Sequence, residues 1–116
     1  MIKVLNIYKL NNLKLEDCIY IGRSNNKFNL SKSPLSNPFT ISTTNNRETV
    51  VNKYKQWLDE VLTYDNIISK EFNRLVELAK VQDLYLLCYC NPKACHGDYI
   101  KQLIENKLKV GMYESI

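Results

Sequence analysis

Several residue types are scarce in this chain: arginine, glycine and proline occur three times each, and histidine and tryptophan once each. No apolar run approaches the ~20 residues that a membrane helix needs, and residues 1–7 lack the layout of a secretory signal peptide. The composition also excludes collagen-like, disordered and coiled-coil proteins. We therefore expect a cytoplasmic protein without a membrane partner.

The composition that remains is that of an ordinary globular domain. The chain has 116 residues, of which 45% are hydrophobic and 24% are charged. A domain of this size buries roughly two-thirds of the surface that its unfolded chain exposes, so one hydrophobic core suffices. Residues 1–116 are expected to form a single domain. In the cytoplasm the four cysteines are expected to be reduced, as core residues, metal ligands or thiolates.

The net charge is +4, and its 13 lysines are scattered along the chain instead of forming blocks. A protein that binds extended nucleic acid normally gathers its basic residues on one face or helix. We therefore do not expect a nucleic-acid partner. The sequence leaves open whether copies of the chain form a homo-oligomer.

The hydrophobic pattern predicts a small α/β fold that is Rossmann-like in part. Residues 3–9 and 17–21 are predicted strands joined as a hairpin, and the continuous apolar run over 84–90 suits the centre of a sheet. Apolar residues at three- and four-residue intervals predict helices over 47–62, over 69–80 and from His96 or Gly97 to 108. Asn45 or Asn46 and Ser69 are the candidate N-caps of the first two. We expect two or three layers, with about three strands and three helices.

The scarce residues concentrate in two loops, over 22–47 and 88–98. These loops hold all three prolines, two of the three glycines, two of the three arginines and the single histidine. A loop of about 25 residues is uncommon in a compact domain unless it has a function. Both loops follow predicted strands, where ligands bind in open α/β sheets. They meet at one edge only if the strands run parallel, which the sequence does not decide.

The loop over 88–98 allows three kinds of chemistry. The free amides at the start of the last helix can bind a phosphate, and Gly97 would let a ligand approach the backbone. In a plainer interpretation, Asp98 complements the helix dipole and Gly97 serves the turn.

A metal site is the second possibility. Zinc prefers cysteine and histidine ligands, and Cys88, Cys90, Cys95 and His96 lie within nine positions. The spacing argues against a closed zinc site, because neighbouring Cys95 and His96 are hard to aim at one ion. Cys88 also suits a buried strand.

Nucleophilic catalysis is the third possibility. A thiol at a helix N-terminus has its thiolate stabilised by the helix dipole, so Cys95 is the best candidate of the four cysteines. His96 is a candidate general acid or base, and Asp98 is its candidate partner.

The first loop contributes candidate ligand-binding residues. In a chain that prefers lysine to arginine by 13 to 3, an arginine is expected where a planar guanidinium must bind phosphate or carboxylate. The candidates are Gly22, Arg23, Asn37, Phe39 and Arg47, with Asn37 for a base or sugar edge and Phe39 for stacking. Alternatively, residues 34–39 form a plug in which Leu35 and Phe39 pack into the core and Asn37 satisfies backbone groups.

Taken together, these motifs resemble a known family. They are Tyr20-Ile21-Gly22-Arg23, Pro34-Leu35-Ser36-Asn37-Pro38-Phe39, Arg47 with Tyr54 and Trp57-Leu58, and Cys88-Tyr89-Cys90-Asn91-Pro92-Lys93-Ala94-Cys95-His96-Gly97-Asp98. In order and over residues 3–106, they are similar to the domain of unknown function 4326, a family of small bacterial and bacteriophage proteins. Tyr89 stands where the family often has tryptophan, and Ser36 where it usually has glycine. The resemblance implies that both loops belong to one site, in a bacterial or phage-infected cell.

Two functions remain open. In the first, the two loops bind a nucleotide or a related phosphorylated small molecule, and the protein either carries out hydrolase or transferase chemistry on it or sequesters a nucleotide signal. In the second, Cys88, Cys90, Cys95 and His96 hold a structural zinc ion in an interaction module without catalysis. The site itself, and not the fold, must decide between them.

Overall fold

The fold is seen in a computed structural model that describes residues 1–10, 12–43, 45–89 and 95–114. Its sheet has three strands: β1 (Ile2–Asn6), β2 (Ile19–Tyr20) and β3 (Leu84–Cys88). The strand order is β1-β3-β2, and β3 pairs in parallel with both neighbours. The expected α/β class and the central position of the third strand are confirmed.

The predicted hairpin between the first two strands is wrong. β3 lies between them, with Leu86 opposite Val4 on one side and Ile19 on the other. The physical reason is burial: four of the five β3 residues are buried, so this strand takes the position in which both edges and both faces are covered. The segment that joins β1 to β2 instead contains a short 3₁₀ helix, Leu15–Asp17. The third strand also ends at Cys88, earlier than predicted, and Cys90 lies outside the described residues.

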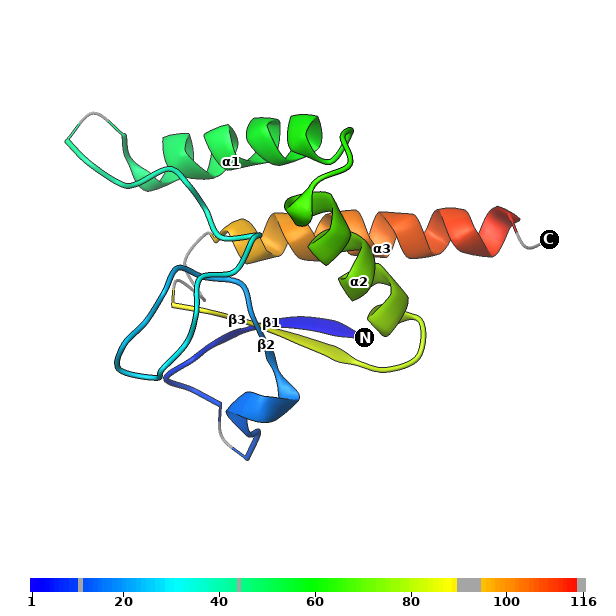
Figure 1. The fold of residues 1–116 in the computed structure, drawn as a ribbon, viewed down its shortest axis with the longest axis horizontal. Helices are drawn as coiled ribbons and strands as arrows, with labels where there is room; N and C mark the ends of the chain where they lie inside the picture. Colours follow the sequence, from blue (N-terminus) through cyan, green and yellow to red (C-terminus); the bar gives the residue numbers. More distant parts are fainter. Residues whose placement is uncertain (11, 44, 90–94, 115–116) are drawn as a thin grey trace.

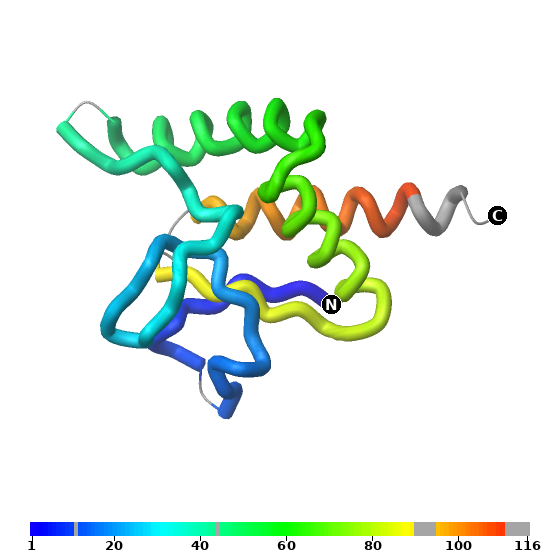
Figure 2. Tube along the Cα trace, viewed as in Figure 1, coloured from blue at the N-terminus to red at the C-terminus, as the bar shows by residue number. Residues whose placement is uncertain are grey.

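Three helices lie on one side of the sheet: α1 (Arg47–Val61), α2 (Ile67–Ala79) and α3 (His96–Glu114) (Figure 1). α2 and α3 contact the strands, whereas α1 packs on α3. The tube view shows the same arrangement, with α3 running past the end of the sheet (Figure 2). α3 therefore continues beyond the predicted end at residue 108.

Side chains of asparagine begin the first two helices. Asn46 caps α1 by accepting a hydrogen bond from the Thr49 amide at 2.8 Å, as predicted. For α2 the predicted cap, Ser69, is wrong. Asn66 caps this helix, and Ser69 stands three residues later as the second half of a reciprocal capping box, so α2 begins at Ile67.

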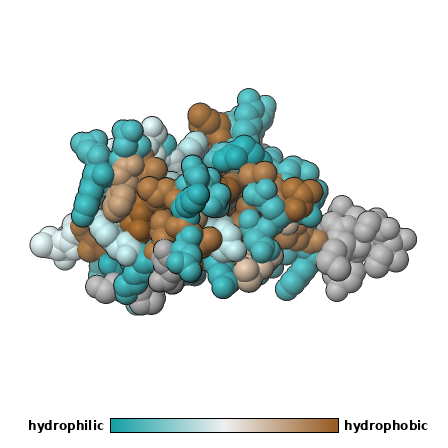
Figure 3. Space-filling view, turned by 90° about the horizontal axis from the view of Figure 1, so that it is seen from below, coloured by the Kyte–Doolittle hydropathy of each residue, from teal (hydrophilic) through white to brown (hydrophobic). Residues whose placement is uncertain are grey.

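The core lies between the sheet and the helices. Its fully buried side chains come from every layer, and they include Ile21, Leu35, Tyr54, Leu58, Leu75, Leu84, Leu86, Leu87, Ile100 and Ile104. On the face shown in Figure 3, apolar patches alternate with polar side chains. Among the described helices, none has the length and apolar character needed to cross a membrane.

The long first loop is anchored to the core and to α1 through Leu35. Its described part, between Tyr20 and Arg47, contains no helix or strand, only an isolated bridge between Asn25 and Leu30. Leu35 is fully buried, and its carbonyl accepts a 2.7 Å hydrogen bond from the hydroxyl of Tyr54 on α1. The plug interpretation of this segment therefore holds for Leu35.

Candidate functional site

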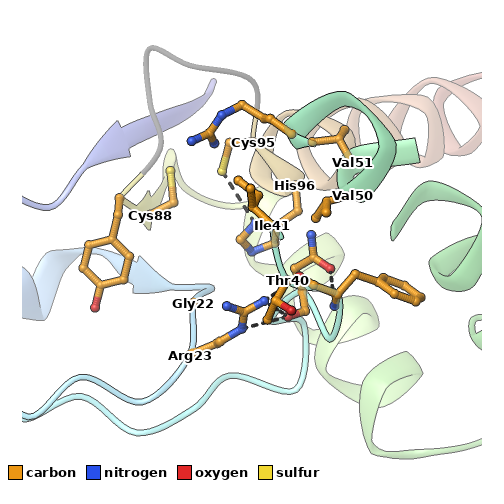
Figure 4. Close-up of a pocket in the computed structure, with 13 residues that line it drawn as sticks. Gly22, Arg23, Thr40, Ile41, Val50, Val51, Cys88, Cys95 and His96 are labelled. Carbon is orange, nitrogen blue, oxygen red and sulfur yellow. Dashed lines mark hydrogen bonds between the residues drawn. The ribbon is translucent and has the colours of Figure 1, made fainter. Parts of the chain in front are cut away.

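The two informative loops meet in one pocket. Because β2 and β3 run parallel, the segments that follow them leave the same edge of the sheet. There they enclose a pocket of about 360 Å³, joined by the start of α1 (Figure 4). The pocket is lined by Gly22, Arg23, Asn37, Phe39, Thr40, Ile41, Arg47, Val50, Val51, Cys88, Tyr89, Cys95 and His96.

Arg23 ties the first loop together at the mouth of this pocket. Its Nε and Nη2 donate to the carbonyl of Asn37 at 3.0 and 2.8 Å, and Nη2 also donates to the carbonyl of Phe39 at 2.6 Å. Among the described residues, no carboxylate pairs with this guanidinium and no acceptor meets its Nη1. Arg23 therefore shapes the loop and still presents N–H groups and a full positive charge to the pocket.

Asn37 and Phe39 belong both to the plug of the first loop and to the lining of the pocket. The Asn37 side-chain oxygen accepts the Phe39 amide at 2.8 Å, and the Phe39 ring packs against the core. Both residues also line the pocket. The side-chain NH₂ of Asn37 has no partner among the described residues, so it remains a donor for a ligand.

His96 is held in one orientation and one tautomer. Its side chain is only 9% exposed, and Nε2 lies 2.6 Å from the carbonyl oxygen of Ile21. A carbonyl can only accept, so Nε2 carries the proton and Nδ1 carries the lone pair. Burial lowers the pKa of His96 below its usual 6.5 and outweighs the hydrogen bond to the Ile21 carbonyl, which raises it, so the neutral imidazole predominates at pH 7.

Cys95 lies directly before α3 and against this imidazole. Its Sγ is 3.6 Å from His96 Nδ1, within reach of a hydrogen bond from a thiol, as Figure 4 shows. The Gly97 amide donates to the same sulfur at 3.3 Å. Only 3% of Cys95 is exposed, yet it lines the pocket. The side chains of Cys95 and His96, neighbours in the sequence, are thus in contact.

The two glycines serve packing. A Cβ on Gly22 would lie 2.5 Å from the Tyr20 hydroxyl oxygen, and one on Gly97 would lie 2.8 Å from Ile21 Cδ1 and 3.0 Å from Val4 Cγ1. Gly97 therefore lets the start of α3 approach the sheet closely, as the last glycine of dinucleotide-binding motifs does. Gly97 does not line the pocket, whereas Gly22 does.

Asp98 lies outside the pocket. It is exposed, and its backbone amide is bonded to the Cys95 carbonyl at 3.1 Å. Together with the Gly97 amide, this leaves two of the first amides of α3 already bonded to Cys95. Whether the start of α3 binds an anion stays a prediction; among the described residues, Arg23 and Asn37 present N–H groups to the pocket for which no acceptor is found.

The metal interpretation rests on four residues, of which three are described. Cys88, Cys95 and His96 line the same pocket, while Cys90 lies outside the described residues. Within the described ranges, no three cysteine, histidine or acidic side chains come close enough together to hold an ion. In addition, His96 Nε2 is already bonded to a carbonyl, which leaves Nδ1 as its one potential ligand atom.

The sequence did not reveal the apolar part of the pocket. Val50 and Val51 belong to the apolar pattern that predicts the helix over 47–62, and Ile41 stands in a polar stretch, so neither pattern points to a pocket. Next to the pocket, the hydroxyls of Tyr20 and Tyr89 are hydrogen-bonded at 2.8 Å, and the ring of Tyr89 contacts that of Tyr8. Such contacts join residues more than 60 positions apart, so no local pattern announces them.

Comparison with known proteins gives a family but no relative with a known activity. The chain matches no curated protein and no solved structure. The model of the family described as domain of unknown function (DUF4326) matches residues 5–106, which includes β2, β3, all three arginines and every residue that lines the pocket. The chain therefore belongs to the DUF4326 family.

Proposed function

We propose that the pocket binds a nucleotide or a related phosphorylated small molecule. The observation that carries the proposal is its charge: two of the chain's three arginines, Arg23 and Arg47, line the pocket, and no acidic side chain is among the residues that line it. An anionic group would find cations there and no repulsion. A guanidinium is also the side chain best suited to bind phosphate with two parallel hydrogen bonds.

The size and lining of the pocket suit a ligand that is part polar and part apolar. Its volume of about 360 Å³ lies within the range of about 300–1,000 Å³ for small-molecule sites. Phe39, Ile41, Val50 and Val51 supply apolar contacts for a base. The side-chain NH₂ of Asn37, for which the described part of the chain offers no acceptor, can donate to the edge of a base or to a sugar oxygen.

Two measurements test this proposal. Native mass spectrometry of protein purified without chelator, compared with its denatured mass, detects a retained ligand directly. Thermal-shift screening against nucleoside mono-, di- and triphosphates, followed by calorimetry, then measures affinity. We expect at least one of these compounds to raise the melting temperature, because a ligand that binds only the folded state stabilises it.

Arg47 offers the sharpest variant, because Arg23 also holds the loop. Replacing Arg47→Ala should weaken the Kd of the best nucleotide by about tenfold or more, as expected for one charge-assisted hydrogen bond. Arg74→Ala is the matched control: it removes the same charge from α2, where Arg74 pairs with Glu71. Equal affinities in the two variants, or no stabilisation by any phosphorylated compound, would contradict the proposal.

A further inference from the structure

Cys95 and His96 have the arrangement of a nucleophile and its base. The bond from His96 Nε2 to the Ile21 carbonyl at 2.6 Å fixes the imidazole, and it leaves Nδ1 as an acceptor. That nitrogen faces the Cys95 sulfur at 3.6 Å (Figure 4). A nucleophile next to a base that a third group orients is the recurring geometry of covalent catalysis.

The surroundings of the sulfur favour its thiolate. The Gly97 amide points at Sγ from 3.3 Å, and Cys95 immediately precedes α3, whose N-terminus carries partial positive charge. Arg23 lines the same pocket, so a phosphate that binds this guanidinium lies in the cavity that the sulfur also faces. The nucleophile, the base and the cation thus come from two segments: the start of α3 supplies the first two, and the loop after β2 supplies the third.

We propose that Cys95 is a catalytic nucleophile that takes the phosphoryl group from a phosphate monoester bound in the pocket. The inference deepens the proposed function and rests on it, since it assigns a reaction to the phosphorylated ligand. A phosphate monoester fits because its negative charge is met by Arg23 and Arg47, and no described acidic side chain lines the pocket to repel it.

The reaction has two steps, and its atoms balance. In the first, His96 Nδ1 takes the thiol proton and Cys95 Sγ attacks phosphorus; the S–P bond forms, the P–O ester bond breaks, and the leaving oxygen takes the proton from Nδ1. In the second, water attacks phosphorus and gives a proton to Nδ1 while the S–P bond breaks. The sulfur then recovers its proton. The net change is hydrolysis of a phosphate monoester to an alcohol and inorganic phosphate, with no oxidant or reductant.

The chain carries a control thiol of its own. Cys18 is half-buried, its Sγ contacts the Lys14 carbonyl at 3.4 Å, and burial together with the charge of Asp17 raises its pKa. Cys18 is therefore less reactive than an ordinary thiol at pH 7. Cys95 is buried, whereas Cys18 is only half-buried. A faster reaction at Cys95 would therefore not be explained by greater exposure to the reagent.

The first experiment measures alkylation by iodoacetamide at pH 7, with peptide mass spectrometry to separate the cysteines. We expect Cys95 to react about tenfold faster than Cys18 or more, because the His96 imidazole can take its proton and the Gly97 amide can stabilise its thiolate. His96→Gln should remove most of this advantage, because glutamine can still donate to the Ile21 carbonyl but supplies no base. Equal rates at the two cysteines, or alkylation of Cys95 that appears only after a chelator removes a metal, would overturn the proposal.

The second experiment looks for the intermediate in the unmodified protein, so it does not depend on how well a variant folds. After rapid mixing with 4-nitrophenyl phosphate, intact mass spectrometry should show one added phosphoryl group, located at Cys95 and absent from Cys95→Ser. Nucleotide binding is measured in the same samples. Binding without any phosphoryl adduct or 4-nitrophenol release would overturn the nucleophile and leave the proposed function standing. If the phosphoryl adduct formed but the protein bound no nucleotide, the proposed function would be overturned instead.

Discussion

A single side chain, Arg23, both orders the loop that forms the pocket and supplies positive charge to it. Its guanidinium is bonded to two loop carbonyls, those of Asn37 and Phe39, and it also faces the pocket. The sequence predicted a ligand-binding arginine here because arginine is scarce. The structure adds that the same side chain orders the loop, so its removal affects stability as well as any ligand.

Replacing Arg23→Ala should lower the free energy of unfolding by about 1–2 kcal/mol, because three hydrogen bonds from a charged but exposed donor are lost. Urea unfolding, followed by the fluorescence of Trp57, measures the change. Arg23→Lys keeps the charge without the planar fork and should recover less than half of the loss. A midpoint unchanged by Arg23→Ala would show that the loop does not depend on these bonds.

The single histidine makes the pH dependence of stability easy to assign. Burial lowers the pKa of His96 in the folded state below the 6.5 of the unfolded chain. The hydrogen bond to the Ile21 carbonyl and the charge of Asp98 oppose this shift, and the charge of Arg23 adds to it. Tyr54, 5.1 Å away between ring centroids, and Cys95 complete its surroundings. The unfolded state therefore binds more protons as the pH falls through 6.5, and stability decreases.

We accordingly expect the unfolding midpoint in urea to fall between pH 7.5 and pH 5.5. In His96→Gln the midpoint should change less over this range, since most carboxylates titrate lower. If the urea midpoint changed equally with pH in the unmodified protein and in His96→Gln, a group other than His96 would control the pH dependence of stability.

At the scale of elements, the contact of α3 with the sheet depends on the absence of a side chain. A Cβ at position 97 would lie 2.8 Å from Ile21 Cδ1 and 3.0 Å from Val4 Cγ1, and Ile21 is fully buried. This close approach brings the start of α3, with Cys95 and His96, to the loop that follows β2. The packing of one helix thus sets the geometry of the site.

Gly97→Ala should lower the free energy of unfolding by about 1–2 kcal/mol, since overpacking a core costs more than alanine gains in a helix. Ile21→Val removes the Cδ1 atom that the new methyl group meets. The double variant should therefore be more stable than the sum of the single changes predicts, with a coupling of about 1 kcal/mol in a double-mutant cycle. If the free-energy changes of the two single variants were strictly additive, the methyl group added at position 97 would not clash with Ile21 Cδ1.

At the scale of the whole molecule, the central strand joins the two edge strands and carries the helices. Leu86 is fully buried and pairs with both Val4 and Ile19. Leu86→Ala should cost about 2–5 kcal/mol in urea unfolding, the range for a leucine deleted from a packed core. Leu108→Ala is the matched control, because Leu108 lies near the end of α3 and is only half-buried where it packs against the core, so it should cost less than half as much. Similar costs at both positions would contradict this organisation.

The sequence by itself determined the local structure: a helix over 47–62 capped by Asn45 or Asn46, of which the structure has Asn46, the central apolar strand, the long loop, and the cluster of scarce residues in two loops. These follow from patterns within a few residues. Only the tertiary structure decided that the strands run parallel, that Arg23 binds loop carbonyls, and that Gly97 packs on the sheet while Asp98 stays outside the pocket. Such features depend on contacts between distant segments, which hydrophobic periodicity and capping residues do not encode.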